Sequence, residues 1–235
     1  MRRDEETAKS ALEHAPPTTP WPEPWTPEGV IATLEPFSGE PRRKRVLEII
    51  QRRLGSVTVV MDAPHDPHNG AAVLRSCEAF GICELHVIPR AEPFLISQTV
   101  TKGTERWVEV SEKPSAAMAA AELKARGFRL VATRPNGRLE PRDLRSLPRL
   151  ALILGNEHDG ISEELERAAD DSVRIPMRGF VESLNVSVAA AILLHAATDG
   201  RPGDLSVEER RRLYAKGLIH SVPRALEILV ASAPR

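Results

Sequence analysis

The sequence predicts an α/β domain with a mainly parallel sheet, joined to helical extensions at its N- and C-terminal ends. Short aliphatic and β-branched segments alternate with segments of helical periodicity between residues 56 and 200, which is the pattern of repeated strand–helix–strand units. Three loops that follow predicted strands are rich in polar residues. Because parallel strands end at the same edge of a sheet, such loops are where this fold class binds ligands.

The composition of the 235-residue chain is that of a globular domain with tails. Hydrophobic residues make up 41% of the chain and charged residues 28%. The formal net charge of −1 excludes an overall positive potential of the kind that indicates nucleic-acid binding. Cys77 and Cys83 are too few for a disulfide framework or a zinc cluster, and they fit a reduced cytoplasmic setting. With no signal core and no apolar run of membrane-spanning length, we expect a soluble cytoplasmic protein and no membrane partner.

Residues 1–41 are expected to form a flexible, proline-rich arm, because eight prolines crowd it and no apolar periodicity survives. Residues 42–55 are expected to form a basic helix that ends at Gly55. Six bases on this helix face a single acid, so phosphate contact is a hypothesis to weigh against a merely solvated face. Those six are Arg42, Arg43, Lys44, Arg45, Arg52 and Arg53.

The central domain is expected to span residues 56–200. Strands are predicted where β-branched and aliphatic residues run together, at 57–61, 84–88, 107–110, 128–133, 150–154 and 172–175. Helices are predicted by their apolar periodicity and their Gly or Ser boundaries, at 69–80, 114–126 and 162–169. Residues 201–235 are expected to form a C-terminal helical extension, with amphipathic helices at 206–216 and 222–230.

The stretch over residues 175–195 changes abruptly from a polar loop to an apolar helix. Glu182, Ser183 and Asn185 precede an almost unbroken apolar run over residues 186–194. A helix that is apolar nearly all round is expected to be buried, and either Ser183 or Asn185 is suited to cap it. From these residues alone, a capped core helix and a ligand-binding loop are equally supported.

Two further polar loops are candidates for chemistry, one over residues 65–70 with Arg75 in the helix behind it, and one over residues 154–160. The short signatures of dinucleotide-binding, P-loop and serine-hydrolase sites are absent from the sequence. His65 and His68 lack the further Cys or His residues that a metal site would need, so no metal is expected.

Each polar residue taken singly has a structural alternative. Arg75 suits a phosphate or a developing oxyanion, but an ion pair with Glu78 or Glu157 would explain it equally well. Glu157 lies in a tight turn where a carboxylate can simply accept backbone N–H groups, and Asn69 is well placed to cap its own helix. The individual residues therefore leave both interpretations open.

Together, the three loops resemble the three sequence motifs of the SpoU (TrmH-type) family of RNA ribose 2′-O-methyltransferases. The matching segments are PHNGAAVLRSCEAFGI at 67–82, LILGNEHDGISEEL at 152–165 and IPMRGFVESLNVSVAAAILL at 175–194. Their order and spacing agree with the family, and the resemblance covers about residues 42–200. Pro67-His68-Asn69, the segment 102–107 and the helical tail favour the branch that methylates guanosine 18 in the tRNA D-loop. Gly70 and His158-Asp159 depart from the family pattern.

The resemblance implies a SPOUT fold, a mainly parallel sheet flanked by helices whose C-terminal part threads a deep trefoil knot. It also implies a homodimer with the active site at the subunit interface, S-adenosylmethionine as the methyl donor, and tRNA as the partner. One catalytic position carried over from the family is Arg75, which would engage the ribose-phosphate and help activate the 2′-oxygen. The others would orient Arg75, the ribose and the cofactor loops; they are Asn69, Glu157, Ser183 and Asn185. The cofactor-binding positions carried over are Thr133, Gly155, Ile175, Ser183 and Leu184.

The basic helix would then hold RNA through Arg42, Arg43, Arg45, Arg52 and Arg53. Two alternatives stand beside this interpretation: the same chemistry on ribosomal RNA, and a non-catalytic RNA-binding protein that keeps the knotted fold. The presence of all five catalytic positions argues against the second, because a pure binding protein has no need of the whole set.

Overall fold

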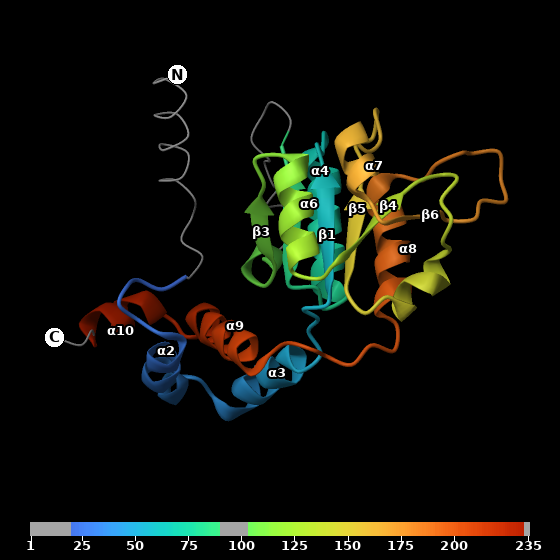
Figure 1. Ribbon diagram of the computed structural model, residues 1–235. Coiled ribbons are helices and arrows are strands. Elements are labelled where there is room, and N and C mark those ends of the chain that lie inside the picture. The colour runs from blue at the N-terminus through green and yellow to red at the C-terminus, as the bar shows by residue number, and fades with distance from the viewer. Residues whose placement is uncertain (1–19, 90–102, 233–235) are drawn as a thin grey trace, which may run out of the picture. The chain divides into compact units, whose positions relative to one another are not determined.

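The computed structural model describes residues 20–89 and 103–232 (Figure 1). Contacts between Cα atoms divide the chain into two units. We call residues 49–206 the α/β unit. The helical unit is built from both ends of the chain, from the residues up to Glu48 and from those that begin at Val207.

A parallel sheet lies at the centre of the α/β unit, and its central strands are buried because their residues are aliphatic or β-branched on both faces. The order across the sheet is β3-β2-β1-β5-β4-β6, with every neighbouring pair parallel. This confirms the predicted parallel α/β fold. The strands are β1 (Val57–Asp62), β2 (Glu84–Ile88), β3 (Glu109–Glu112), β4 (Arg129–Thr133), β5 (Leu150–Leu154) and β6 (Asp171–Val173). The knot implied by the resemblance stays a prediction.

Helices cover both faces of the sheet (Figure 1). Alternate residues of β1 point to opposite faces, so Val59 lies in one apolar core with α4 and α8, and Val60 lies in the other with α6 and α7. The helices of this unit are α4 (Pro67–Ala79), α6 (Ala116–Ala125), α7 (Glu163–Ala168) and α8 (Val186–Thr198), and the short 3-10 helices are η2 (Thr104–Arg106) and η3 (Pro141–Ser146).

Helix α8 differs from the expected fully buried helix. Its inner face is buried through Ala190, Leu193 and Leu194. On another face Val188 and Ile192 are 47% and 39% exposed, and their four-residue spacing places them side by side. The prediction of burial all round is therefore wrong for a single chain, because none of the described elements of the α/β unit covers this second apolar face.

The helical unit corrects the prediction of a flexible arm where the structure describes it, over residues 20–41. Residues 27–34 form a helix with Pro27 in its first turn, where a proline fits. Trp21, Val30 and Leu34 are buried. These apolar side chains hold the segment in a folded structure, although its many prolines favoured a flexible arm. Residues 1–19 lie outside the described residues.

Residues from both ends of the chain pack together in this unit. Helix α2 packs against α9 and α10, the Tyr214 hydroxyl donates to Glu35 Oε1 (2.7 Å), and Arg211 pairs with Glu28 (2.7 Å). Burial, together with the hydrogen bond to Glu35, raises the pKa of Tyr214 to about 12. The elements are α2 (Pro27–Leu34), η1 (Glu35–Phe37), α3 (Glu40–Ile50, which continues into the α/β unit), α9 (Val207–Ser221) and α10 (Ala225–Ala231).

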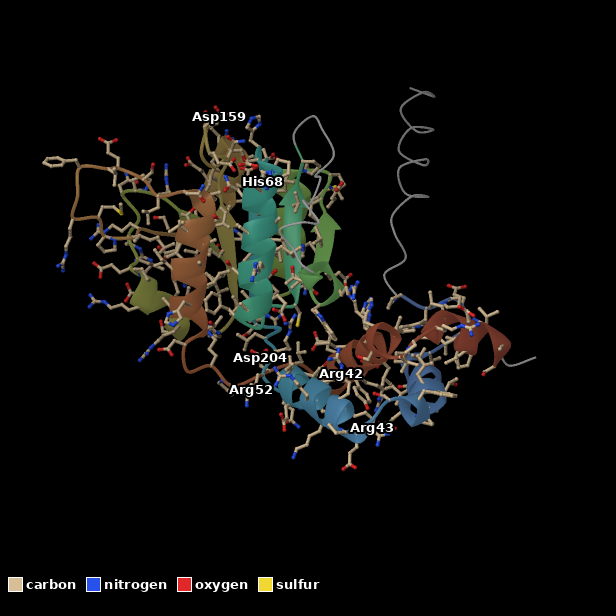
Figure 2. The ribbon with its side chains drawn as sticks, turned by 180° about the vertical axis from the view of Figure 1, so that it is seen from behind. Arg42, Arg43, Arg52, His68, Asp159 and Asp204 are labelled. Atoms are coloured by element: carbon tan, nitrogen blue, oxygen red, sulfur yellow. The ribbon has the colours of Figure 1, made fainter. Side chains whose placement is uncertain are left out.

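The segment that follows α8 and contains Asp204 packs against the end of the α/β unit that lies opposite to His68 and Asp159 (Figure 2). The Arg201 guanidinium donates to carbonyl oxygens on α8 and around η3: those of Ala197 (2.6 Å), Leu144 (3.0 Å), Leu147 (2.5 Å) and Pro148 (3.3 Å). Asp204 accepts the Gly55 N–H (2.6 Å). A Cβ on Gly203 would lie 1.9 Å from the carbonyl oxygen of Gln51, so only glycine fits at this position.

Within the described ranges, 20–89 and 103–232, no helix has both the length and the apolarity that a membrane crossing requires.

Candidate active site

The first polar loop presents Asn69 at the start of α4. β1 ends at Asp62, and Asp66 caps the helix by accepting the His68 N–H (2.8 Å). An Asp at the N-cap followed by Pro in the first turn is a strong helix-start signal. The helix therefore begins at Pro67, two residues before the predicted start, and Asn69 lies in its first turn instead of capping it. Asn69 still lies at the carboxyl edge of the sheet, where the sequence predicted this loop.

The second polar loop is a tight turn held by Asn156. Backbone hydrogen bonds join Asn156 and Gly160 in both directions (2.8 and 3.0 Å), and the Asn156 side chain accepts the His158 N–H (2.8 Å) and donates to the Ala63 carbonyl oxygen (2.5 Å). Sequence reasoning missed this role of Asn156, although an Asn in a Gly-bounded turn is a known signal for such bonding. A Cβ on Gly155 would lie 2.5 Å from the carbonyl carbon of Gly160, so the turn requires glycine there.

A hydrogen-bonded chain of side chains joins all three polar loops. Asn185, which caps α8, donates through Nδ2 to Asn69 Oδ1 (3.0 Å). Asn69 in turn donates through Nδ2 to Glu157 Oε1 (2.8 Å), and the His65 N–H donates to Glu157 Oε2 (3.2 Å). Three of the five predicted catalytic positions are therefore in direct contact, although they come from sequence positions far apart.

The Glu157 carboxylate is held in its ionised form. Burial acts to raise its pKa, but the hydrogen bonds from Asn69 and from the backbone N–H groups of Glu157, His65 and Asp66 outweigh burial, and the net shift of the pKa is downward. An ionised Glu157 can only accept hydrogen bonds. The Asn69 amide is thus fixed with its nitrogen toward Glu157 and its oxygen toward Asn185.

Arg75 lies on α4 with an exposed side chain. Neither structural alternative is found: Glu78 pairs with Arg53 (3.5 Å), and Glu157 is bonded to Asn69. Within residues 20–89 and 103–232, the guanidinium forms no hydrogen bond or ion pair. It is therefore free to bind an anionic group.

A pocket lies where β4 and β6 end and α8 begins, and four of the five predicted cofactor-binding positions line it: Thr133, Ile175, Ser183 and Leu184. Apolar side chains such as Val173 and Leu193 form part of its wall, and the Glu182 carboxylate also lines it. Apolar walls suit a flat aromatic base, and a carboxylate suits an ammonium or hydroxyl group. The lining thus fits S-adenosylmethionine. Gly155, the fifth position, is in the neighbouring turn rather than in the lining.

Four of the five predicted RNA-binding residues divide into two groups. Arg45 and Arg52 are exposed, and in the described part of the chain neither side chain has a hydrogen bond or ion pair. Arg42 and Arg43 (Figure 2) are each bonded once within the helical unit, to the Ser221 hydroxyl (3.3 Å) and the Glu35 carbonyl (3.1 Å) respectively.

The structure corrects the prediction that Arg53 binds RNA. Its side chain is only 3% exposed, and its guanidinium donates to the carbonyl oxygens of Glu78 (3.2 Å), Ile82 (3.1 Å) and Trp107 (2.7 Å). The helix ends at Ile50 rather than near Gly55, so Arg53 lies beyond it and turns into the α/β unit. It stabilises the fold and cannot reach an RNA phosphate.

Among the residues that the structure describes, no group of three or more His, Cys, Asp or Glu side chains could hold a metal ion. His65 and His158 instead make an edge-to-face ring contact, with centroids 5.2 Å apart.

Comparison with known proteins agrees with this geometry. Residues 56–195 match the family model described as SpoU rRNA Methylase family. A Thermus thermophilus protein named tRNA (guanosine(18)-2′-O)-methyltransferase is 38% identical over 161 residues, which cover 67% of this chain and 82% of that protein.

Two solved structures are similar in fold. The Aquifex aeolicus TrmH/SpoU tRNA modifying enzyme has a TM-score of 0.70 and 31% identity, covering 79% of this chain and 98% of the other. The SpoU methyltransferase AviRb from Streptomyces viridochromogenes, in complex with the cofactor AdoMet, has a TM-score of 0.58 and 28% identity, covering 65% of this chain and 63% of the other.

Proposed function

The chain belongs to the SpoU methylase family, and from that premise we propose that it transfers a methyl group from S-adenosylmethionine to the ribose 2′-hydroxyl of guanosine 18 in tRNA. The observation that carries the proposal is the hydrogen-bonded chain Asn185–Asn69–Glu157. It draws together the three polar loops beside the pocket lined by Ser183 and Leu184. The relatives' names supply the RNA and the nucleotide.

The residues present can hold the methyl donor in the pocket at the ends of β4 and β6. Thr133, Ile175, Ser183 and Leu184 would contact it. When bound, S-adenosylmethionine supplies an electrophilic methyl carbon on a sulfonium.

The ribose 2′-hydroxyl is a poor nucleophile until its proton leaves or the charge on its oxygen is stabilised. Arg75 would stabilise this charge, because its guanidinium is free to bind an anionic group. It would bind the nucleotide's phosphate or ribose and stabilise the negative charge that develops on the 2′-oxygen. The ionised Glu157 orients Asn69, and the Asn185 cap ties Asn69 to the start of α8. Asn69 can then position the ribose, because both ends of its amide are fixed.

The direct test is to incubate the full-length protein with labelled S-adenosylmethionine and an unmodified tRNA transcript, then to map the label. We expect the label on the ribose of guanosine 18, and none on a transcript that carries a 2′-deoxyguanosine there. Label on ribosomal RNA alone would move the target to another RNA. Absence of both transfer and cofactor binding would contradict the proposal.

We also propose that the protein works as a homodimer in which the exposed apolar face of α8 is covered by the second subunit. Val188 and Ile192 lie on the helix that begins at Asn185, and exposed aliphatic neighbours of this kind are typical of an interface. A dimer formed there would place the second subunit beside the candidate active site, and it would explain why this face remains exposed in one chain.

We expect Val188→Asp combined with Ile192→Asp to convert the dimer to a monomer, because two carboxylates would have to be desolvated on association. Light scattering coupled to gel filtration measures the change. Met118→Asp is the matched control, since Met118 is 57% exposed but lies on α6, at the other face of the sheet. A double variant that stays dimeric would place the interface elsewhere.

We propose that exposed arginines of α3 and its continuation bind the RNA backbone. Arg45 and Arg52 are the sharpest test, because each is exposed and a charge change there breaks no internal bond. We expect Arg45→Glu with Arg52→Glu to weaken tRNA binding and to reduce the slope of log affinity against log salt by roughly one for each phosphate that is no longer bound. Arg167→Glu, on α7, is the control. Unchanged affinity in filter binding would mean that these arginines are merely solvated.

A further inference from the structure

The edge-to-face contact between His65 and His158 lies on the two loops that enclose Glu157. The ring centroids are 5.2 Å apart and the planes are inclined by 67°, a geometry in which the edge of one ring meets the face of the other. His65 follows β1 and His158 follows β5, and these two strands are neighbours in the sheet. The contact thus bridges two adjacent loops at the sheet edge where Figure 2 labels His68 and Asp159.

The two loops are already joined at a second point. The Asn156 side chain donates to the Ala63 carbonyl oxygen and accepts the His158 N–H. Glu157 lies between Asn156, which makes these hydrogen bonds, and His158, which makes the ring contact. The Glu157 Oε2 atom accepts the N–H of His65. The backbone of one histidine therefore binds the carboxylate, and the other histidine is the next residue after that carboxylate in the chain.

Neither imidazole is committed to another partner. Across residues 20–89 and 103–232, the ring contact is the interaction that both side chains make, and both residues are exposed. The rings contribute little to the apolar core. Removal of either ring should therefore change the position of the loops much more than the stability of the fold.

We propose that the His65–His158 contact is a positioning element of the methyl-transfer site, which fixes the distance between the two loops and with it the Glu157 carboxylate that orients Asn69. The inference rests on the proposed methyltransferase function. The chemistry required is the aromatic contact rather than proton transfer, so a phenyl ring should replace an imidazole.

The test compares His158→Ala, His158→Gln and His158→Phe in the full-length protein. We expect a kcat lower by roughly five- to tenfold for the alanine and glutamine variants, from the loss of one edge-to-face pair, with unchanged KM for tRNA and unchanged Kd for S-adenosylmethionine. The phenylalanine variant should recover kcat to within about twofold of the wild type. The double variant with His65→Ala should be no slower than His158→Ala alone, because both remove the same contact.

A glutamine variant that retains full kcat, a phenylalanine variant as slow as alanine, or additive losses in the double variant would each overturn the proposal. A second readout does not depend on activity. Exchange of the His65 amide hydrogen, which is bonded to Glu157, should accelerate in the alanine variant and not in the phenylalanine variant. If the wild type methylates no RNA but this exchange pattern holds, the proposed function fails and the loop contact stands; if exchange is the same in all variants, the loop contact fails.

Discussion

Arg75→Ala is expected to lower kcat for methyl transfer by a factor on the order of 10² to 10³, the usual cost of removing one donor that stabilises a developing oxyanion. The protein should remain folded, because the Arg75 side chain is exposed and makes no bond within the described residues that the substitution would break. Binding of S-adenosylmethionine should be unchanged, because Arg75 does not line the pocket. Single-turnover methylation of tRNA together with calorimetric cofactor binding measures both quantities.

Arg75→Lys separates charge from geometry in the same assay. A lysine retains the positive charge but loses the planar fork of donors, so we expect it to recover only a small part of the lost rate. Arg167→Ala is a control for the removal of an exposed arginine, since the Arg167 side chain forms a surface pair with Glu163 (2.9 Å), and such pairs contribute little to stability. An Arg75→Ala protein that binds the cofactor and methylates at the wild-type rate would remove Arg75 from the mechanism.

Arg201→Ala is expected to destabilise the α/β unit by about 3 kcal/mol, since several charged hydrogen bonds to backbone carbonyls are removed together. For a chain of this size, that corresponds to a fall of about 6–12 °C in the midpoint of thermal unfolding. Burial lowers the pKa of Arg201, but it stays protonated at neutral pH, so the effect should persist across the neutral range. Calorimetry or circular dichroism on heating measures it.

Arg145→Ala is the matched control for that experiment. Arg145 lies on η3, the element whose carbonyl groups Arg201 contacts, but its side chain is exposed and its carboxylate partner, Asp199, is 3.8 Å away. A surface pair of this kind contributes little, so the unfolding midpoint should change by no more than a degree or two. Equal shifts for the two variants would show that Arg201 does not have the stabilising role inferred from its hydrogen bonds.

The alternation of strands and helices could be predicted from the sequence because each element carries its own signal. A run such as Leu150–Leu154 is a buried strand in any parallel sheet, and the structure has this strand where it was predicted. The start of α4 was placed two residues too late, because the signal of Asp66 and Pro67 was overlooked. The helix at Pro27–Leu34 could not be predicted in the same way. It depends on burial of Val30 and Leu34 against residues nearly 200 positions later, a long-range contact that local composition does not contain.

The candidate site shows the same division. The residue types were recognised from the three motifs, and the structure places Asn69, Glu157 and Asn185 in contact. The bonding of Asn156 was missed, because the partner of its amide, Ala63, lies 93 positions earlier. Arg53 was misassigned because an arginine in a basic run looks like its neighbours until the end of the helix turns it inward.

The order of the two units along the chain has a consequence during protein synthesis. The α/β unit is one continuous segment, so it is complete once Ser206 has left the ribosome. The helical unit is discontinuous: α2 emerges early but has its packing partners, α9 and α10, only at the very end. The α/β unit can therefore fold first, before α2 has its packing partners. A chain that terminates after Ser206 would keep the pocket and lose α9 and α10, against which α2 packs.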